Sequence, residues 1–223
     1  MLIRKLVFFS YIFFALGCEK KQKNQSYLAL GDGYTIGEAI SNNESWPMQL
    51  VKALEEENIL IDKPKIIAQT GWTTTGLKKG VDLAILDFPY DWVSLLIGVN
   101  NQYQGKSIEV FKAEFQQLLS QAILFAGNKS ERLFVVSIPD WGKMPFANNL
   151  DQEKISREID DYNQVVYEVC IRNDITFIDV TTLSRTTDSN PHLIASDSLH
   201  PSGSQYAKWV TEIIPFFKNS SND

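Results

Sequence analysis

Residues 28–38 read LALGDGYTIGE, and this stretch decides which fold the rest of the chain is built around. Residues 27–30 (YLAL) form a short apolar run of the kind that becomes a buried β-strand. Residues 31–33 (GDG) then favour a sharp turn, and the polar residues after them lead away from the strand end. A parallel α/β sheet carries its chemistry outside the carboxyl ends of its strands. Functional residues are therefore expected where the strands end.

Strand-like and helix-like segments alternate along the rest of the chain. Short apolar or β-branched runs predict strands at 64–69, 92–97, 133–138 and 175–180. Apolar residues at three-to-four spacing predict helices over 45–58, 108–125 and 155–171, a helix capped by Thr73 with Leu77, Val81, Ala84 and Ile85 on one face, and a last helix from Pro201 to about Phe217. This alternation predicts an α/β fold, a three-layer sandwich in which a doubly wound sheet of about five parallel strands has helices on both faces.

The composition is that of one globular domain after a distinct N-terminal segment. The chain has 223 residues, of which 44% are hydrophobic and 22% charged, enough for a sizeable core. Its formal net charge is −6, and loss of the basic N-terminal residues Arg4 and Lys5 would make it more negative by two charges. An acidic domain argues against a nucleic-acid partner, which favours a basic surface.

The first residues have the pattern of a secretory signal peptide. Arg4 and Lys5 precede an apolar run over residues 6–16, which is too short to span a bilayer as a helix. Residues 15–18 (ALGC) resemble the lipobox of bacterial lipoproteins, although Ala15 stands where leucine is most usual. The resemblance implies a signal peptide over residues 1–17, lipid on Cys18, a polar tether over 18–25 and a domain over 26–223, held at an extracytoplasmic membrane surface. The alternative is a plain signal peptide that happens to contain a cysteine.

Four short motifs fall at the expected loops. They are GDG at 31–33, Gly71, GVNN at 98–101 and DSLHP at 197–201. Their order and spacing resemble the SGNH (GDSL-type) ester hydrolases over essentially the whole chain after the tether. The resemblance implies an SGNH-hydrolase-like fold and an esterase lineage, acting on short acyl groups or carbohydrate O-acetyl esters without cofactor or metal. A flavodoxin-like binding domain is the alternative, but the chain lacks a long hydroxyl-rich phosphate loop after the first strand.

The resemblance assigns a role to one residue of each motif. Gly33 occupies the position of the nucleophilic serine. The backbone N–H groups of Gly33 and Gly71 and the Asn100 side chain correspond to the oxyanion donors, which stabilise charge on the carbonyl oxygen. His200 corresponds to the general base and Asp197 to the carboxylate that orients it. Imidazole suits this role because its pKa lets it accept a proton near neutral pH. A hydroxyl becomes a useful nucleophile only when such a base takes its proton.

Neighbouring residues have simpler expected roles. Asn101 stands where the family often has aspartate, which we interpret as a minor variation. Asp32 is expected to brace the loop, and Thr35 to cap the helix that follows rather than to replace the missing serine. Trp141 and Phe146 could line a substrate cleft, but ordinary packing is the favoured interpretation.

Glycine at position 33 leaves three hypotheses open, since it has no side chain that could attack an acyl carbon. The chain could be an inactive variant or pseudoenzyme of the esterase lineage, by natural loss or by substitution. It could activate water directly with His200. It could also be a non-catalytic binding protein for acylated glycans or other surface esters. In each case the expected partner is a small acylated molecule, the protein is a monomer, and membrane contact comes through the lipid anchor only.

Overall fold

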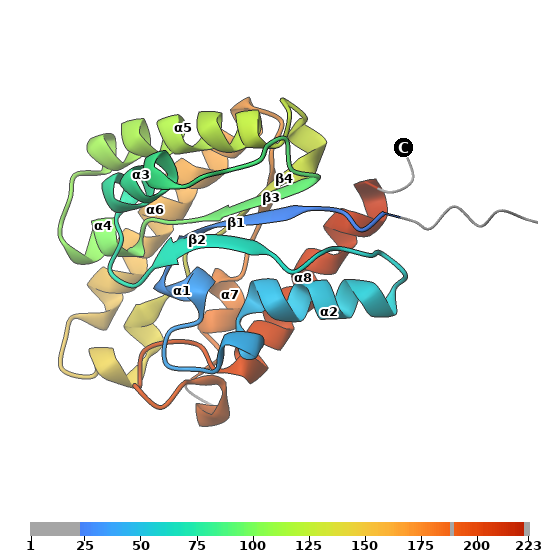
Figure 1. The fold of residues 1–223 in the computed structure, drawn as a ribbon. Helices are drawn as coiled ribbons and strands as arrows, with labels where there is room; N and C mark the ends of the chain where they lie inside the picture. Colours follow the sequence, from blue (N-terminus) through green and yellow to red (C-terminus); the bar gives the residue numbers. More distant parts are fainter. Residues whose placement is uncertain (1–22, 188–189, 221–223) are drawn as a thin grey trace, which may run out of the picture.

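Five parallel strands form the centre of the computed structural model, which describes residues 23–187 and 190–220 (Figure 1). They run in the order β2-β1-β3-β4-β5. Their bounds are Tyr27–Asp32 for β1, Lys65–Gln69 for β2, Trp92–Leu96 for β3, Leu133–Val136 for β4 and Thr176–Ile178 for β5. The strand order reverses between β1 and β3, which is where a doubly wound sheet opens a crevice for ligands.

Helices cover both faces of this sheet, so the predicted three-layer α/β sandwich is confirmed (Figure 1). On one face, α2 (Trp46–Glu56) packs against α8 (Gly203–Ser220). On the other lie α3 (Thr74–Leu83), α5 (Ile108–Phe125) and α6 (Gln152–Arg172), each in contact with its neighbour. The helix boundaries agree with the apolar periodicity within a few residues, because each apolar stripe has to be buried against the sheet.

The central strands are buried on both faces. Every residue of β1, β3 and β4 is buried, which explains their nearly continuous apolar sequences. Ser94 is the polar exception in β3, and its hydroxyl is hydrogen-bonded to that of Tyr27 at 2.8 Å. Gly31 of β1 lies level with Leu96 of β3. The turns after these two strands therefore leave the sheet side by side, and this brings the GDG and GVNN motifs together.

Three short helices follow the strands and were not predicted. They are α1 (Gly33–Ile36) after β1, α4 (Val99–Tyr103) after β3 and α7 (Thr181–Ser184) after β5. A helix of four or five residues is too short to show a periodic pattern. The prediction for α3 was wrong at its end: the helix stops at Leu83, Ala84 is extended, and Ile85 is 85% exposed.

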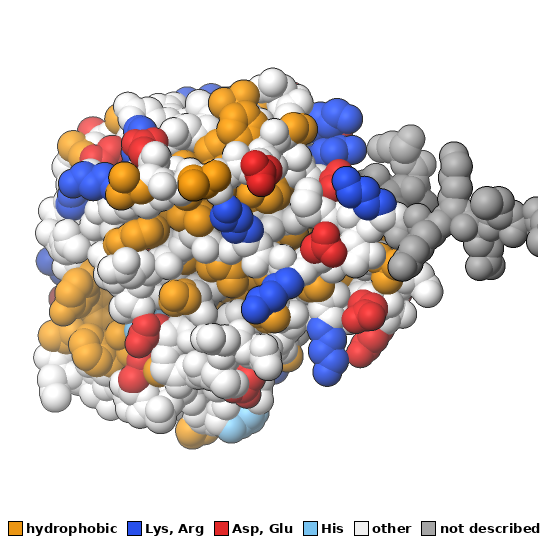
Figure 2. Space-filling view, viewed as in Figure 1, with side chains coloured by type: hydrophobic (Ala, Val, Ile, Leu, Met, Phe, Trp, Pro, Cys, Tyr) orange, Lys and Arg blue, Asp and Glu red, His pale blue; other side chains and the backbone are white. Residues whose placement is uncertain are grey.

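The described chain begins at the opposite end of the sheet from the loops that follow β1, β2 and β3 (Figure 1). The predicted signal peptide and Cys18 lie outside the described residues. In residues 23–187 and 190–220, none of the helices is long and apolar enough to cross a membrane. Figure 2 shows acidic and basic side chains interspersed over one face of the molecule.

Candidate active site

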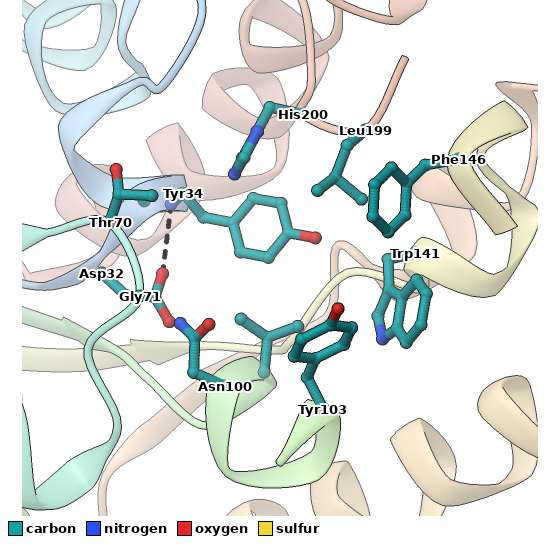
Figure 3. A pocket seen from close by; sticks show the side chains of 12 residues that line it. Asp32, Tyr34, Thr70, Gly71, Asn100, Tyr103, Trp141, Phe146, Leu199 and His200 are labelled. Atoms are coloured by element: carbon teal, nitrogen blue, oxygen red, sulfur yellow. Dashed lines mark hydrogen bonds between the residues drawn. The ribbon is translucent and has the colours of Figure 1, made fainter. Parts of the chain in front are cut away.

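The carboxyl ends of β1, β2 and β3 enclose a pocket of about 220 Å³ (Figure 3). Residues from all four sequence motifs line it, together with an aromatic wall. The lining residues are Asp32, Gly33, Tyr34, Thr70, Gly71, Val99, Asn100, Tyr103, Trp141, Phe146, Leu199 and His200. The structure thus brings Gly33, Gly71, Asn100 and His200 to one place, as predicted from the motifs.

Asp32 braces the turn that presents Gly33. It is the N-cap of α1, and its Oδ1 accepts a hydrogen bond from the Tyr34 N–H at 3.1 Å (Figure 3). The side chain is fully buried, and burial raises the pKa of this carboxyl to about 7. The Oδ2 atom has no hydrogen-bond partner among the described residues. Asp32 therefore acts on the loop, as expected from the sequence.

Gly33 faces the base directly. A Cβ built on Gly33 would lie 3.2 Å from Nε2 of His200 and 3.5 Å from Oγ1 of Thr70. The backbone of Gly33 lies outside the left-handed region, so an L-residue can adopt its conformation. A side chain at position 33 would point at the His200 ring nitrogen.

Asp197 and His200 form a hydrogen-bonded pair behind this point. Oδ2 of Asp197 lies 2.5 Å from Nδ1 of His200, and Oδ1 accepts the backbone N–H groups of Leu199 and His200 at 3.0 and 2.9 Å. Burial acts to raise the pKa of Asp197, but the hydrogen bonds from the His200 ring and from these two backbone groups outweigh it and lower the pKa below its usual value. A carboxylate on Nδ1 leaves Nε2 free to accept a proton on the pocket side.

Gly71 and Asn100 stand on the other side of the pocket. Gly71 has φ +81°, a conformation that favours glycine, and a Cβ there would meet no atom within 4 Å. The Asn100 amide donates one hydrogen bond to the Trp72 carbonyl at 3.0 Å, which leaves its second N–H for a ligand. Asn101 is fully buried, and its Oδ1 accepts the Thr74 N–H at 2.9 Å in the first turn of α3, whose N-cap is Thr73 as predicted.

Four aromatic side chains line the rest of the pocket (Figure 3). The Trp141 ring contacts Tyr103 and Phe146 at centroid distances of 5.5 and 6.2 Å, and Tyr34 packs against the His200 ring at 5.5 Å. The favoured interpretation of Trp141 and Phe146 as packing residues was therefore incomplete, since both line the pocket. The sequence analysis did not identify Tyr34, which directly follows the GDG motif, or Tyr103, which lies two residues after the GVNN motif.

Thr35 does not cap a helix, and this expectation was wrong. Asp32 supplies the cap, whereas Thr35 is fully buried and its hydroxyl has no hydrogen-bond partner among the described residues. A Cβ on Gly31 would lie only 2.1 Å from the Thr35 hydroxyl oxygen, so Gly31 makes room for this side chain. Thr35 does not line the pocket and is not placed to act as a nucleophile.

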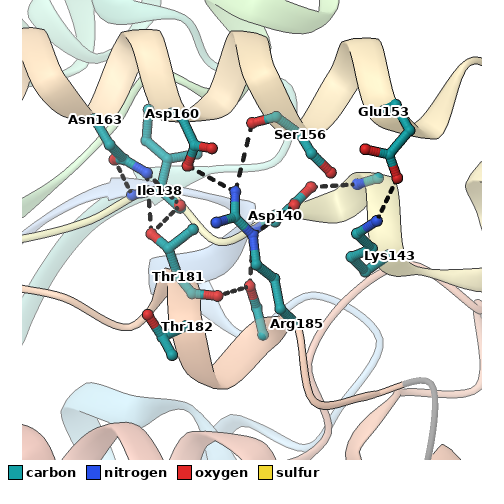
Figure 4. A network of polar contacts seen from close by, with 12 residues as sticks. Ile138, Asp140, Lys143, Glu153, Ser156, Asp160, Asn163, Thr181, Thr182 and Arg185 are labelled. Atoms are coloured by element: carbon teal, nitrogen blue, oxygen red, sulfur yellow. Dashed lines mark hydrogen bonds and ion pairs between the residues drawn. The ribbon is translucent and has the colours of Figure 1, made fainter.

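A second polar network holds the loop after β4, which carries Trp141 and Phe146 (Figure 4). Asp140 is fully buried, and its carboxylate accepts the Gly142 N–H and the Arg185 Nε–H, both at 2.9 Å. Arg185 also donates to Asp160 of α6 at 2.7 Å. Further along the loop, the Phe146 N–H donates to the Ser198 carbonyl at 3.0 Å. The network thus fixes the start of this loop next to Trp141. The hydrogen bond from Phe146 connects the same loop to the segment that contains His200.

The chain belongs to the GDSL-like Lipase/Acylhydrolase family. The family model matches residues 29–208, which include all four motifs. No curated protein matches the chain by sequence. The fold and the motif residues in one pocket thus agree with the family that the sequence resembled.

Solved structures of the same fold include several esterases. TesA is 16% identical with a TM-score of 0.69, covering 88% of this chain and 99% of its own. The psychrotrophic esterase EstA from Pseudoalteromonas sp., solved with monoethylphosphonate as inhibitor, is 17% identical with a TM-score of 0.68, covering 90% and 100%. Axe2, an acetylxylan esterase from Geobacillus stearothermophilus, is 18% identical with a TM-score of 0.62, covering 88% and 93%. At these identities the likeness concerns the fold.

Proposed function

We propose that this protein binds short-acyl esters in the pocket at Gly33, carbohydrate O-acetyl esters foremost, and hydrolyses them very slowly because glycine occupies the nucleophile position. The observation that carries the proposal is the 3.2 Å between a Cβ at position 33 and Nε2 of His200. A serine hydroxyl one bond beyond that Cβ would be within reach of the base. The oxyanion hole in this proposal consists of the N–H groups of Gly33 and Gly71 and the Asn100 amide.

The proposed chemistry follows from the arrangement of these groups. An ester carbonyl oxygen directed at the three donors would be stabilised as it becomes negative, by about 3–4 kcal/mol for each donor. Asp197 holds His200 in the tautomer that accepts a proton at Nε2. Without a hydroxyl at position 33, what remains in a triad enzyme is on the order of 10³–10⁴-fold over water.

The decisive experiment is Gly33→Ser. This variant adds one small side chain to a backbone that accepts it, and His200 has to shift by only a few tenths of an ångström. We expect the variant to gain esterase activity on 4-nitrophenyl acetate and to become sensitive to serine-directed organophosphorus reagents, which the unmodified chain resists. A folded Gly33→Ser protein that stays inactive on short-acyl esters would refute the proposal and favour the binding-protein hypothesis.

The substrate range is proposed from the size and lining of the pocket. A cavity of about 220 Å³ with an aromatic wall suits a short acyl group and a sugar ring stacked on the exposed ring of Tyr103. An acyl-length series with Gly33→Ser tests this point, and we expect acetyl to be preferred. A preference for chains of about eight carbons or more would contradict it, since such chains require a larger apolar site.

The cellular location is a separate proposal that rests on the lipobox-like residues 15–18. Cleavage before Cys18 and lipid on its thiol would hold the domain at an extracytoplasmic membrane surface. The pocket lies at the carboxyl ends of the strands and the described chain begins at their amino ends, so the pocket would point away from the anchor. Cys18→Ser should release the protein or leave it unprocessed, and unchanged membrane retention and electrophoretic mobility would contradict the proposal.

A further inference from the structure

The space beside Gly33 is faced by two polar atoms from different parts of the chain. His200 Nε2 and Thr70 Oγ1 are the nearest atoms to the position of a Cβ on Gly33, at 3.2 and 3.5 Å. The next nearest is the Thr70 Cα at 3.6 Å, apart from Gly33, its chain neighbours and the backbone of α1. All three residues line the pocket, so this space opens to a bound ester.

Both polar atoms present lone pairs to this space. The Thr70 hydroxyl donates its single hydrogen to the Glu38 carboxylate, which has no hydrogen to give. The Thr70 oxygen is therefore left as an acceptor. His200 donates from Nδ1 to Asp197, so Nε2 is an acceptor as well. Two acceptors that lie 3.2 and 3.5 Å from the same point can accept the two hydrogens of one water molecule held there.

We propose that Thr70 and His200 together hold the attacking water in this protein, so that it hydrolyses esters in one displacement without an acyl-enzyme. This proposal rests on the proposed function, since it requires an ester bound in the same pocket. With both hydrogens engaged, the water directs its oxygen lone pairs at the ester carbonyl. Thr70 acts as a positioning residue, with Glu38 fixing the direction of its hydroxyl, and His200 is the general base.

The water oxygen forms a bond to the acyl carbon while its proton passes to Nε2 of His200, and the carbonyl π electrons move onto the oxygen facing Gly71 and Asn100. The tetrahedral intermediate then collapses, the bond to the alkoxy oxygen breaks, and the proton on Nε2 passes to that oxygen. One ester and one water give one carboxylic acid and one alcohol, and the protein returns to its starting state.

Gly33→Ala tests the space itself. The added methyl group lies 3.2 and 3.5 Å from the two acceptors and takes the place of the water, yet it supplies no hydroxyl. We expect 4-nitrophenyl acetate hydrolysis, measured with a serine-directed organophosphorus reagent present to silence contaminating esterases, to fall by about tenfold or more from the rate of the unmodified chain. If Gly33→Ala and the unmodified chain hydrolyse the ester at equal rates, the proposal is wrong.

Thr70→Val tests the positioning role and keeps the proposal testable if Gly33→Ala misfolds. The matched control is Thr75→Val, because Thr75 also donates its hydroxyl to a glutamate, Glu114 at 3.0 Å, but does not line the pocket. We expect Thr70→Val to lose about tenfold in rate and Thr70→Ser, which keeps the hydroxyl, to recover most of that loss, while Thr75→Val retains the rate. Equal losses in Thr70→Val and Thr75→Val would overturn the proposal.

Gly33→Ser separates this proposal from the proposed function and from a merely structural role for Thr70. In that background the serine takes the place of the water, so Thr70→Val should cost less than in the unmodified chain. The serine variant should also release 4-nitrophenol in an initial burst, which the unmodified chain lacks. If Gly33→Ser is active but the unmodified chain hydrolyses the ester no faster than the single variant His200→Ala, the water site is wrong and the proposed function stands. An inactive Gly33→Ser protein would overturn the proposed function.

Discussion

Two aspartates in this protein each bind a basic side chain, and they differ in separation, burial and consequence. Asp197 and His200 are three residues apart, their side chains are 32% and 13% exposed, and the His200 ring faces the pocket. Asp140 and Arg185 are 45 residues apart, and Asp140 is fully buried beneath the loop that carries Trp141. The first pair leaves one ring nitrogen free for chemistry. The second uses its hydrogen bonds to hold backbone and helices in place, so similar residue types serve opposite purposes.

The largest effect is expected at the exposed pair. In a Gly33→Ser background, His200→Ala should lower kcat by on the order of 10⁴-fold or more, because the serine loses its base. The free energy of unfolding should change little, since the ring is part of the pocket surface. Steady-state kinetics with 4-nitrophenyl acetate and urea denaturation of the same samples measure both. A variant that loses stability but keeps its activity would reverse the roles assigned to the two pairs.

The buried pair should show the opposite pattern. Removing Arg185 by Arg185→Met leaves the Asp140 carboxylate buried without its partner, and we expect the free energy of unfolding to fall by about 3–5 kcal/mol. Asp160→Ala is the matched control, since it removes the other partner of the same guanidinium. The Asp160 side chain is 56% exposed. Its cost should not exceed about 1 kcal/mol. Equal losses in the two variants would show that burial of Asp140 does not set the strength of this network.

The smallest effect concerns Asp32, a third aspartate, which has no basic partner among the residues that the structure describes. Its folded pKa of about 7 lies above the ordinary value of 3.8, so the folded state binds this proton more tightly than the unfolded state. The contribution of Asp32 to the free energy of unfolding is therefore highest below pH 3.8. It falls as the pH rises to about 7 and stays constant above that pH. A pKa difference of one corresponds to about 1.4 kcal/mol, so the loss is a few kcal/mol at most.

Asp32→Asn tests this slope. The asparagine oxygen can still accept the Tyr34 N–H, but the side chain no longer titrates. Urea denaturation between pH 4 and pH 8 should show a smaller fall in the free energy of unfolding for the variant than for the unmodified chain. Above pH 7 the variant should be the more stable of the two. Parallel stability curves would mean that the Asp32 proton is not linked to folding.

The sequence predicted the parts of the site that depend on local spacing. Only two residues separate Asp197 from His200, which lets the carboxylate return to the ring, and the resemblance to the SGNH family implied this pair. The strand ends could be located because the apolar runs of β1 and β3 stop at glycine motifs. The short helices α1 and α4 could not, because four or five residues carry no helical period.

The aromatic wall and the water-holding atoms required the tertiary structure. The sequence around Trp141 was ambiguous, since an aromatic residue in a loop can either pack in the core or line a cleft. Only its contacts with Tyr103 and Phe146 around the pocket show that it lines the cleft. Thr70 gave no signal in the sequence, because a threonine before a turn glycine is common. Its importance comes from Glu38 and His200, which lie far away along the chain.

By itself the sequence determined the fold class, the four motifs, the Asp197–His200 pair and the absence of a hydroxyl at position 33. These features depend on residue type and on separations of a few residues, which the backbone converts directly into geometry. The tertiary structure alone decided that the missing side chain would point at His200 Nε2 with Thr70 beside it, and that Asp140 is buried against Arg185. The physical reason is that such contacts join segments far apart in sequence, and their distances are set by how the helices pack on the sheet.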